Sequence, residues 1–257
     1  MAQFEIKDGI CVIPDGTKTI SENAFSYCTN LTSITIPNSV TTIGEGAFLG
    51  CKGLTSITIP DTVTEIGGGA FMECRSLINI TIPDSVIKIG KWAFVGSGLT
   101  SIALPDSINT MDVDGAFASC GRLTNFTLPR SITRIGDEMF AGCSSLTSIN
   151  IPNSVRIIGA KSFSGCRGLH DITIPNSVFK IEYRAFSDCT GLTKVTIPDS
   201  VYLIDHKAFD QCEKLAVLAI PKGCRHKFLR ILPSEYGDKL IEVSESQIQE
   251  QDQKQFG

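Results

Sequence analysis

Ten cysteines and three histidines are the residues of this 257-residue chain that could form disulfides or hold a metal ion. Cysteine is among the most buried residue types, so a regular column of cysteines predicts packed free thiols. Equivalent side chains of stacked copies point in parallel directions, which is poor geometry for disulfides. The histidines match no zinc-binding spacing, and we expect no cofactor. Eight cysteines share one position of a 23-residue period: Cys28, Cys51, Cys74, Cys120, Cys143, Cys166, Cys189 and Cys212.

A hydrolytic triad is the second kind of chemistry that the residues suggest. Ser148, His170 and Asp171 would lie on adjoining strands. His170 and Asp171 are consecutive, however, so their side chains diverge and the aspartate cannot orient the imidazole from behind. No phosphate loop, G-x-S-x-G or H-E-x-x-H motif occurs. We therefore expect a protein that is not an enzyme.

Phenylalanine gives the period of the whole chain. Such a fixed period predicts a solenoid, in which stacked copies bury a shared core that one short copy could not enclose. Nine phenylalanines recur every 23 residues: Phe25, Phe48, Phe71, Phe94, Phe117, Phe140, Phe163, Phe186 and Phe209. One copy is irregular, because Ser97 replaces the repeat cysteine, one residue is lost before Leu99 and one is gained before Phe117.

A typical copy predicts one short strand and one tight turn. Ile57 and Ile59 lie two residues apart in a β-branched run, so they face inward from a strand that Pro60 ends. We expect Gly67 to adopt a backbone conformation that most residues avoid. Residues 70–74 then predict a helical turn that places a phenylalanine and a cysteine inside. Aligned strands make a parallel sheet along one side of the solenoid.

The pattern L-x-x-I-x-I-P-x-S-V-x-x-I-G-x-x-A-F-x-x-C over residues 31–214 resembles the BspA-like leucine-rich repeats of bacterial surface proteins and some protozoan parasites. The resemblance implies a mainly β, α/β repeat solenoid. It is a right-handed leucine-rich repeat of about nine copies, with one parallel sheet face and short helical turns opposite. It also implies macromolecular binding, often in adhesion, and supplies no catalytic residues. Residues 1–30 are then an N-terminal cap with a partial first repeat, 215–243 a C-terminal cap and 244–257 a flexible tail.

Composition and charge restrict the partners. Hydrophobic residues at 42% and charged residues at 19% suit a soluble folded chain. A net charge of −4 gives nucleic acid no general attraction, and no apolar run is long enough for membrane insertion. We expect a monomer. Without a signal peptide the chain is cytoplasmic as written, and at the cell surface or secreted if a leader was removed. Residues 1–120 hold 6 basic against 12 acidic residues, net −6, and residues 121–230 hold 15 against 9, net +6.

Outward-facing columns are the candidate binding residues, because inward columns are fixed by packing. Exposed aromatic and arginine side chains anchor many protein interfaces, which favours the columns of the C-terminal half. The expected function is a protein-binding scaffold, and the alternative is a surface adhesin for host or matrix glycoproteins or carbohydrate. Interrupted threonine columns argue against ice binding. Trp92 stands alone in the column of Lys161. The candidates are Arg156, Phe179 and Tyr202; Lys161, Arg184 and Lys207 beside Tyr183 and His206; and Asp171 and Lys194 on the sheet face.

Overall fold

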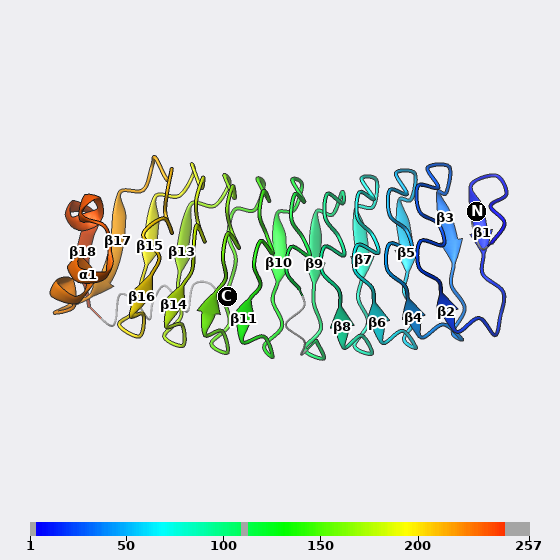
Figure 1. Cartoon of the computed structure of the whole chain (residues 1–257), viewed down its shortest axis with the longest axis horizontal. Helices are drawn as coiled ribbons and strands as arrows, with labels where there is room; N and C mark the ends of the chain where they lie inside the picture. Colours follow the sequence, from blue (N-terminus) through cyan, green and yellow to red (C-terminus); the bar gives the residue numbers. More distant parts are fainter. Residues whose placement is uncertain (1–3, 109–112, 245–257) are drawn as a thin grey trace.

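The computed structural model describes residues 4–108 and 113–244. The coils stack side by side into one elongated row (Figure 1), a mainly β solenoid of about 10 turns of about 23 residues. This confirms the repeat architecture predicted from the phenylalanine period. The predicted tail at 244–257 lies, apart from Ser244, outside the described residues.

The first sheet is a row of strands in four hydrogen-bonded groups. It follows the isoleucine pattern in most copies, but residues 148–150 form no strand, and its last strand lies in the predicted C-terminal cap, where no strand was expected. All its pairs are parallel, and the middle residue of each three-residue strand is buried, as Ile57 is between the exposed Ser56 and Thr58. Cys11 pairs with Ile34 and Ile57 with Ile80, so the core column continues into the first coil. The strands are β1 (Ile10–Val12), β3 (Ser33–Thr35), β5 (Ser56–Thr58), β7 (Asn79–Thr81), β9 (Ser101–Ala103), β10 (Asn125–Thr127), β13 (Asp171–Thr173), β15 (Lys194–Thr196), β17 (Val217–Pro221) and β18 (Leu240–Val243).

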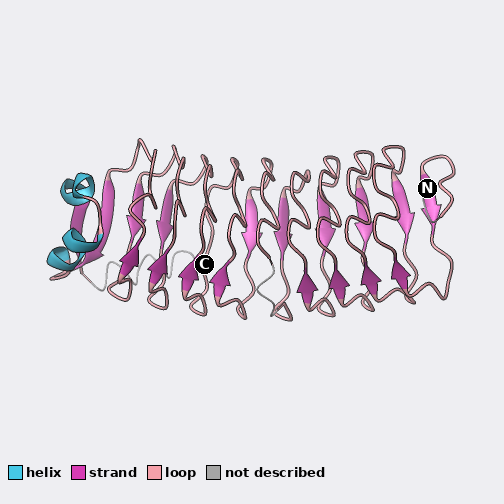
Figure 2. Cartoon of the chain, in the orientation of Figure 1, coloured by secondary structure: helices cyan, strands magenta, loops and turns pink. Residues whose placement is uncertain are grey.

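A second row of parallel strands, in two hydrogen-bonded groups of four, accompanies the first and lies below it in Figure 2; we call it the second sheet. Each of its strands has two residues, of which the second is buried. A two-residue strand is too short to show an alternation of apolar and polar residues, so the sequence pattern predicted only the first sheet. The strands are β2 (Thr19–Ile20), β4 (Thr42–Ile43), β6 (Glu65–Ile66), β8 (Lys88–Ile89), β11 (Arg134–Ile135), β12 (Ile157–Ile158), β14 (Lys180–Ile181) and β16 (Leu203–Ile204).

The irregular copy changes the register where the sequence predicts. Asn125 of β10 pairs with Ser101 of β9, an offset of 24 residues instead of 23. Ser97 is buried in the place of the repeat cysteine, and its Oγ lies 3.3 Å from Cys120 Sγ. The residue gained before Phe117 falls in a segment of which 109–112 lie outside the described residues.

The stacked phenylalanine rings form the spine of the core. Ring centroids of successive copies lie 5.2 Å apart for Phe25 and Phe48, and 6.1 Å apart for Phe117 and Phe140. The wider gap occurs where Phe126 inserts edge-on between two copies. All nine repeat phenylalanines are buried. The turns that carry them are closed by hydrogen bonds to the residue three positions earlier, which gives the predicted helical-turn geometry without a regular helix.

Two ends close this spine. Phe4 stacks on Phe25 at 5.7 Å at the N-terminal end, beside a turn in which Asp8 and Gly9 both have positive φ. At the other end, α1 (Arg225–Ile231) buries Phe228 and η1 (Ser234–Lys239) places Tyr236 edge-on against Phe209 at 6.0 Å. These helices are the only ones of residues 4–108 and 113–244 (Figure 2).

Candidate functional site

The repeat geometry aligns Arg156, Phe179 and Tyr202 directly before β12, β14 and β16. The amide of Phe179 donates to the Arg156 carbonyl at 3.0 Å, and the amide of Tyr202 donates to the Phe179 carbonyl at 3.1 Å. The Phe179 and Tyr202 rings therefore stack, with centroids 5.5 Å apart and planes at 3°. Tyr202 is 61% exposed. The predicted column is thus a continuous aromatic strip that begins at an arginine.

The second predicted column follows the same strands, with Lys161, Arg184 and Lys207 in successive turns. Lys161 Nζ lies 2.9 Å from Glu138 Oε1, and that hydrogen bond raises the pKa of Lys161 above its ordinary value. Arg184 pairs with Asp210 at 3.3 Å. Among residues 4–108 and 113–244, no ion pair joins the Lys207 ammonium to an acid. The column keeps its cations, but two of the three are partly neutralised.

Tyr183 and His206 lie beside these cations. The Arg184 guanidinium lies 5.5 Å from the centroid of the Tyr183 ring, within the range of a cation–π contact. His206 Nδ1 lies 3.6 Å from Asp205 Oδ1, and the imidazole is largely exposed. Together the eight residues of the two columns and their neighbours form what we call the aromatic and basic edge: Arg156, Lys161, Phe179, Tyr183, Arg184, Tyr202, His206 and Lys207.

A hollow of about 280 Å³ lies over β14 and β16, and of the eight edge residues only Tyr183 lines it. Tyr183 and the exposed Leu203 line it, and Glu182 lies among the lining residues. Burial alone would raise the pKa of Glu182, but hydrogen bonds from Arg134 at 2.6 Å and Lys180 at 2.8 Å lower it below its ordinary value. Glu182 is therefore an anion that bridges the side chains of Arg134 and Lys180. Sequence reasoning missed Leu203 and this ion network, because both depend on the second sheet.

The other two candidates lie on the first sheet, apart from the edge. Asp171 of β13 pairs in register with Lys194 of β15, and Thr193 Oγ1 donates to Asp171 Oδ1 at 3.1 Å. Among the described residues, no hydrogen bond joins Ser148 to His170. The structure thus places Asp171 in a polar ladder and brings no triad together.

The eight repeat cysteines form a column of free thiols that is interior apart from the half-buried Cys28. Cys51 Sγ donates to the Phe25 carbonyl at 3.0 Å, and the same bond recurs from coil to coil. The described part of the chain contains no cluster of histidine, cysteine or acidic residues that could hold a metal ion. It also contains no helix with the length and apolar character that a membrane span requires.

Comparison with known proteins agrees with this geometry. The family profile described as BspA type leucine rich repeat region (6 copies) matches residues 10–114 and 113–227. A leucine-rich repeat protein from Bacteroides ovatus ATCC 8483 has a crystal structure that is 27% identical, with 82% of this chain and 75% of that chain covered and a TM-score of 0.59. A leucine rich cell surface protein from Faecalibacterium prausnitzii A2-165 is 28% identical over 86% of this chain and 73% of its own, with a TM-score of 0.49. The comparison with curated proteins gives no match.

Proposed function

Because this chain belongs to the family of BspA-type leucine-rich repeat proteins, we propose that it is a non-catalytic scaffold that binds another protein through its aromatic and basic edge. In a repeat solenoid the inward columns are fixed by packing, so only the outward columns are free to specify a partner. The edge is the outward region that brings together three aromatic rings, those of Phe179, Tyr183 and Tyr202, with the cations of two successive columns.

The stacked pair of Phe179 and Tyr202 is the observation that carries this proposal. The Tyr202 ring is 61% exposed and contributes no burial to the core. Tyrosine and arginine are enriched among the residues that dominate binding energies, because they combine a large apolar area with a polar group. The backbone hydrogen bonds align the two residues and the rings stack on each other, so a partner that contacts them would order fewer free side chains.

The charge of this half indicates the kind of partner surface. Residues 121–230 carry a net charge of +6. Arg156 and Lys207 are the cations of the edge that take part in no ion pair among the described residues. We therefore expect the partner to present carboxylates around an apolar contact with the aromatic strip.

A triple charge reversal tests the proposal. We expect Lys161→Glu, Arg184→Glu and Lys207→Glu together to abolish capture of the partner from an extract of the source cell, as measured by quantitative mass spectrometry. Tyr202→Ala alone should weaken binding by about tenfold or more, in the range of an interface anchor. The melting temperature should change little, because exposed ion pairs contribute only about 0–1 kcal/mol each.

The control variant reverses three lysines away from the edge, Lys18, Lys52 and Lys222, all of which are exposed. It changes net charge by the same amount and should capture the same partner as the unmodified protein. If the edge variant captures that partner as well as the control does, the edge is not the binding surface.

A further inference from the structure

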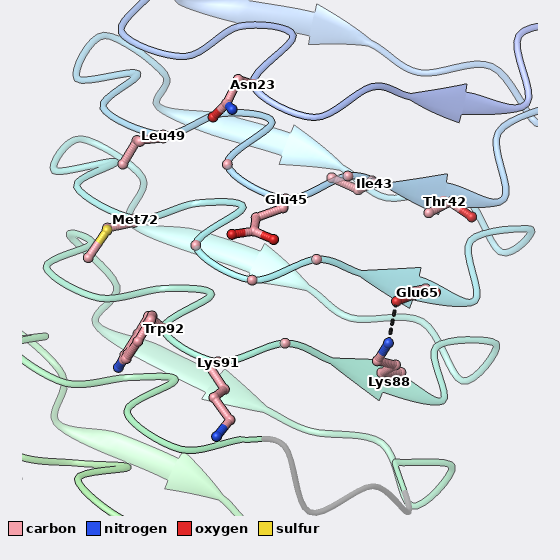
Figure 3. Close-up of a pocket in the computed structure, with 16 residues that line it drawn as sticks. Asn23, Thr42, Ile43, Glu45, Leu49, Glu65, Met72, Lys88, Lys91 and Trp92 are labelled. Carbon is pink, nitrogen blue, oxygen red and sulfur yellow. Dashed lines mark hydrogen bonds and ion pairs between the residues drawn. The ribbon is translucent and has the colours of Figure 1, made fainter.

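A groove of about 600 Å³ crosses the turns next to β4, β6 and β8, in the half of the molecule away from the aromatic and basic edge (Figure 3). Glycines form its floor at two positions of successive coils, as at Gly67 and Gly69. Leu49, Met72 and Trp92 lie along one side, and Glu65 and Lys88 lie on the other. We call this feature the glycine groove. It has an apolar side, a charged side and a floor without side chains.

Trp92 stands at the end of the glycine groove in a position that folding does not favour. Its φ is +59°, in the left-handed region that most of its column shares, with glycines in the two neighbouring coils, Gly69 and Gly115, and side chains further along, as at Lys161. A left-handed conformation disfavours any residue with a side chain. The indole packs against Gly115, where a Cβ would come within 2.4 Å of its Cδ1. It nevertheless remains 53% exposed, so core packing does not explain a tryptophan here.

Glu45 supplies a second carboxylate to the same groove, in addition to that of Glu65. Glu65 pairs with Lys88 at 2.6 Å, and Lys91 pairs with Asp114 at 3.2 Å. Among the ion pairs of the described residues, none includes Glu45, whose side chain lies between the two sides of the groove in Figure 3. Residues 1–120 carry a net charge of −6. A cation is therefore the occupant that this charge distribution attracts.

We propose that the glycine groove binds an arginine side chain of a basic peptide segment. The aliphatic stem would lie on the glycine floor beside Leu49 and Met72. The guanidinium would pair with the Glu45 carboxylate and contact the face of Trp92, because a planar cation both hydrogen-bonds carboxylates and stacks on indole rings. An uncharged occupant such as a neutral glycan would leave Glu45 without a counter-ion.

This second site is independent of the function proposed above. The glycine groove lies between Asn23 and Trp92, whereas the aromatic and basic edge lies between Arg156 and Lys207. The two also have opposite charge preferences. A failure of one proposal therefore leaves the other intact.

Fluorescence measures binding at this site directly, because Trp92 is the only tryptophan of the chain. We expect a saturable change in emission when the full chain is titrated with a blocked triarginine peptide at low ionic strength. A blocked triglutamate peptide and a neutral chitin oligosaccharide should give no change. Added salt should weaken the triarginine response, since this contact is largely solvent-exposed.

Matched variants test the contacts. Glu45→Gln should weaken triarginine binding by about fivefold or more, because it removes the charge and keeps the shape. Asp61→Asn removes the same charge from an exposed turn outside the groove and should bind like the unmodified protein. Trp92→Gly should abolish binding in calorimetry, since it removes the indole and leaves the residue that neighbouring coils carry.

Three results would overturn the proposal: no triarginine response, equal losses in Glu45→Gln and Asp61→Asn, or a saturable response to the oligosaccharide in place of triarginine. The triple charge reversal of the aromatic and basic edge should bind triarginine at least as well as the unmodified protein. That comparison separates the two sites.

Discussion

The buried thiols show how one residue type satisfies several requirements of a stacked coil. Cys51 and Cys166 each donate a hydrogen bond to the carbonyl of a phenylalanine 26 residues earlier, at 3.0 and 3.2 Å. Cysteine is small, apolar and a weak donor, so it fits where a larger or more polar residue would not. Burial raises the pKa of Cys51 and of Cys166 to about 12. The thiols are therefore protonated wherever the protein is folded at ordinary pH.

This raised pKa predicts that the protein becomes less stable in alkali. An unfolded thiol ionises near its ordinary value of 9.0, while the folded thiol holds its proton to a higher pH. The thiol contribution is therefore fully present below pH 9 and is lost as pH rises toward the folded pKa. We expect the free energy of unfolding, measured with urea between pH 8 and 10, to fall steeply above pH 9.

A variant with Cys143→Ala and Cys166→Ala separates this effect from other titrations. Its slope against pH above 9 should be shallower by up to about 1.4 kcal/mol per pH unit for each thiol removed. Lysines and tyrosines titrate equally in both proteins. An unchanged slope would mean that the buried thiols do not control the alkaline transition.

The repeat pattern predicted the turn that follows Gly67 correctly, but the reason it gave for this glycine is wrong. Gly67 was expected to adopt an unusual backbone conformation, but the positive φ angles occur elsewhere in each coil, for example at Gly69 with +58° and at Glu73 with +59°. A Cβ at Gly67 would lie 2.5 Å from the Glu45 amide nitrogen of the preceding coil. Gly67 is therefore required for close approach of two coils. A sequence pattern cannot distinguish these two reasons for a glycine.

Replacing two glycines tests this explanation at the level of the coil. Gly67→Ala should lower the free energy of unfolding by about 1–3 kcal/mol, as overpacking against backbone does. Gly121→Ala should leave stability unchanged or raise it by up to about 1 kcal/mol, because it restricts the unfolded chain. Among the described residues other than its two chain neighbours, the only atom within 4 Å of a Cβ at Gly121 is Ser144 Oγ, at 3.6 Å. Equal urea midpoints for the two variants would contradict the close-approach argument.

The 23-residue period was enough to predict which residues of the aromatic and basic edge align. The ion pairs that partly neutralise its cations could not be predicted, because they depend on the three-dimensional path of each coil. Residues 23 apart must align in a regular solenoid, which is why Phe179 and Tyr202 could be paired from the sequence. The Arg184 and Asp210 pair spans 26 residues and joins two different positions of the repeat. The glycine groove was not predicted, because its depth comes from glycines, which have no side chains to fill the space between the two sides.

At the scale of the whole molecule, stability is a sum over neighbouring coils. Side-chain hydrogen bonds between coils connect residues about one period apart, as from Thr64 to Thr41 and from Cys74 to Phe48. The phenylalanine stack is likewise a series of neighbour contacts that Phe4 begins and Tyr236 ends. In such a solenoid each interior coil contributes its own stability and one additional interface.

Deleting one complete period is therefore expected to leave a folded protein. Removal of residues 54–76 joins Gly53 to Leu77, the residue equivalent to Leu54, and places Phe48 against Phe94 in the ring stack. The shortened chain should retain the circular dichroism of parallel strands and unfold cooperatively, with a lower urea midpoint because one interface is lost. Deletion of residues 54–65 alone removes about half a period, places Phe71 out of register and should prevent cooperative folding. If both shortened proteins fold equally well, the continuous core does not determine the stability of this chain. If the protein that lacks the full period does not fold, the coils are not interchangeable units.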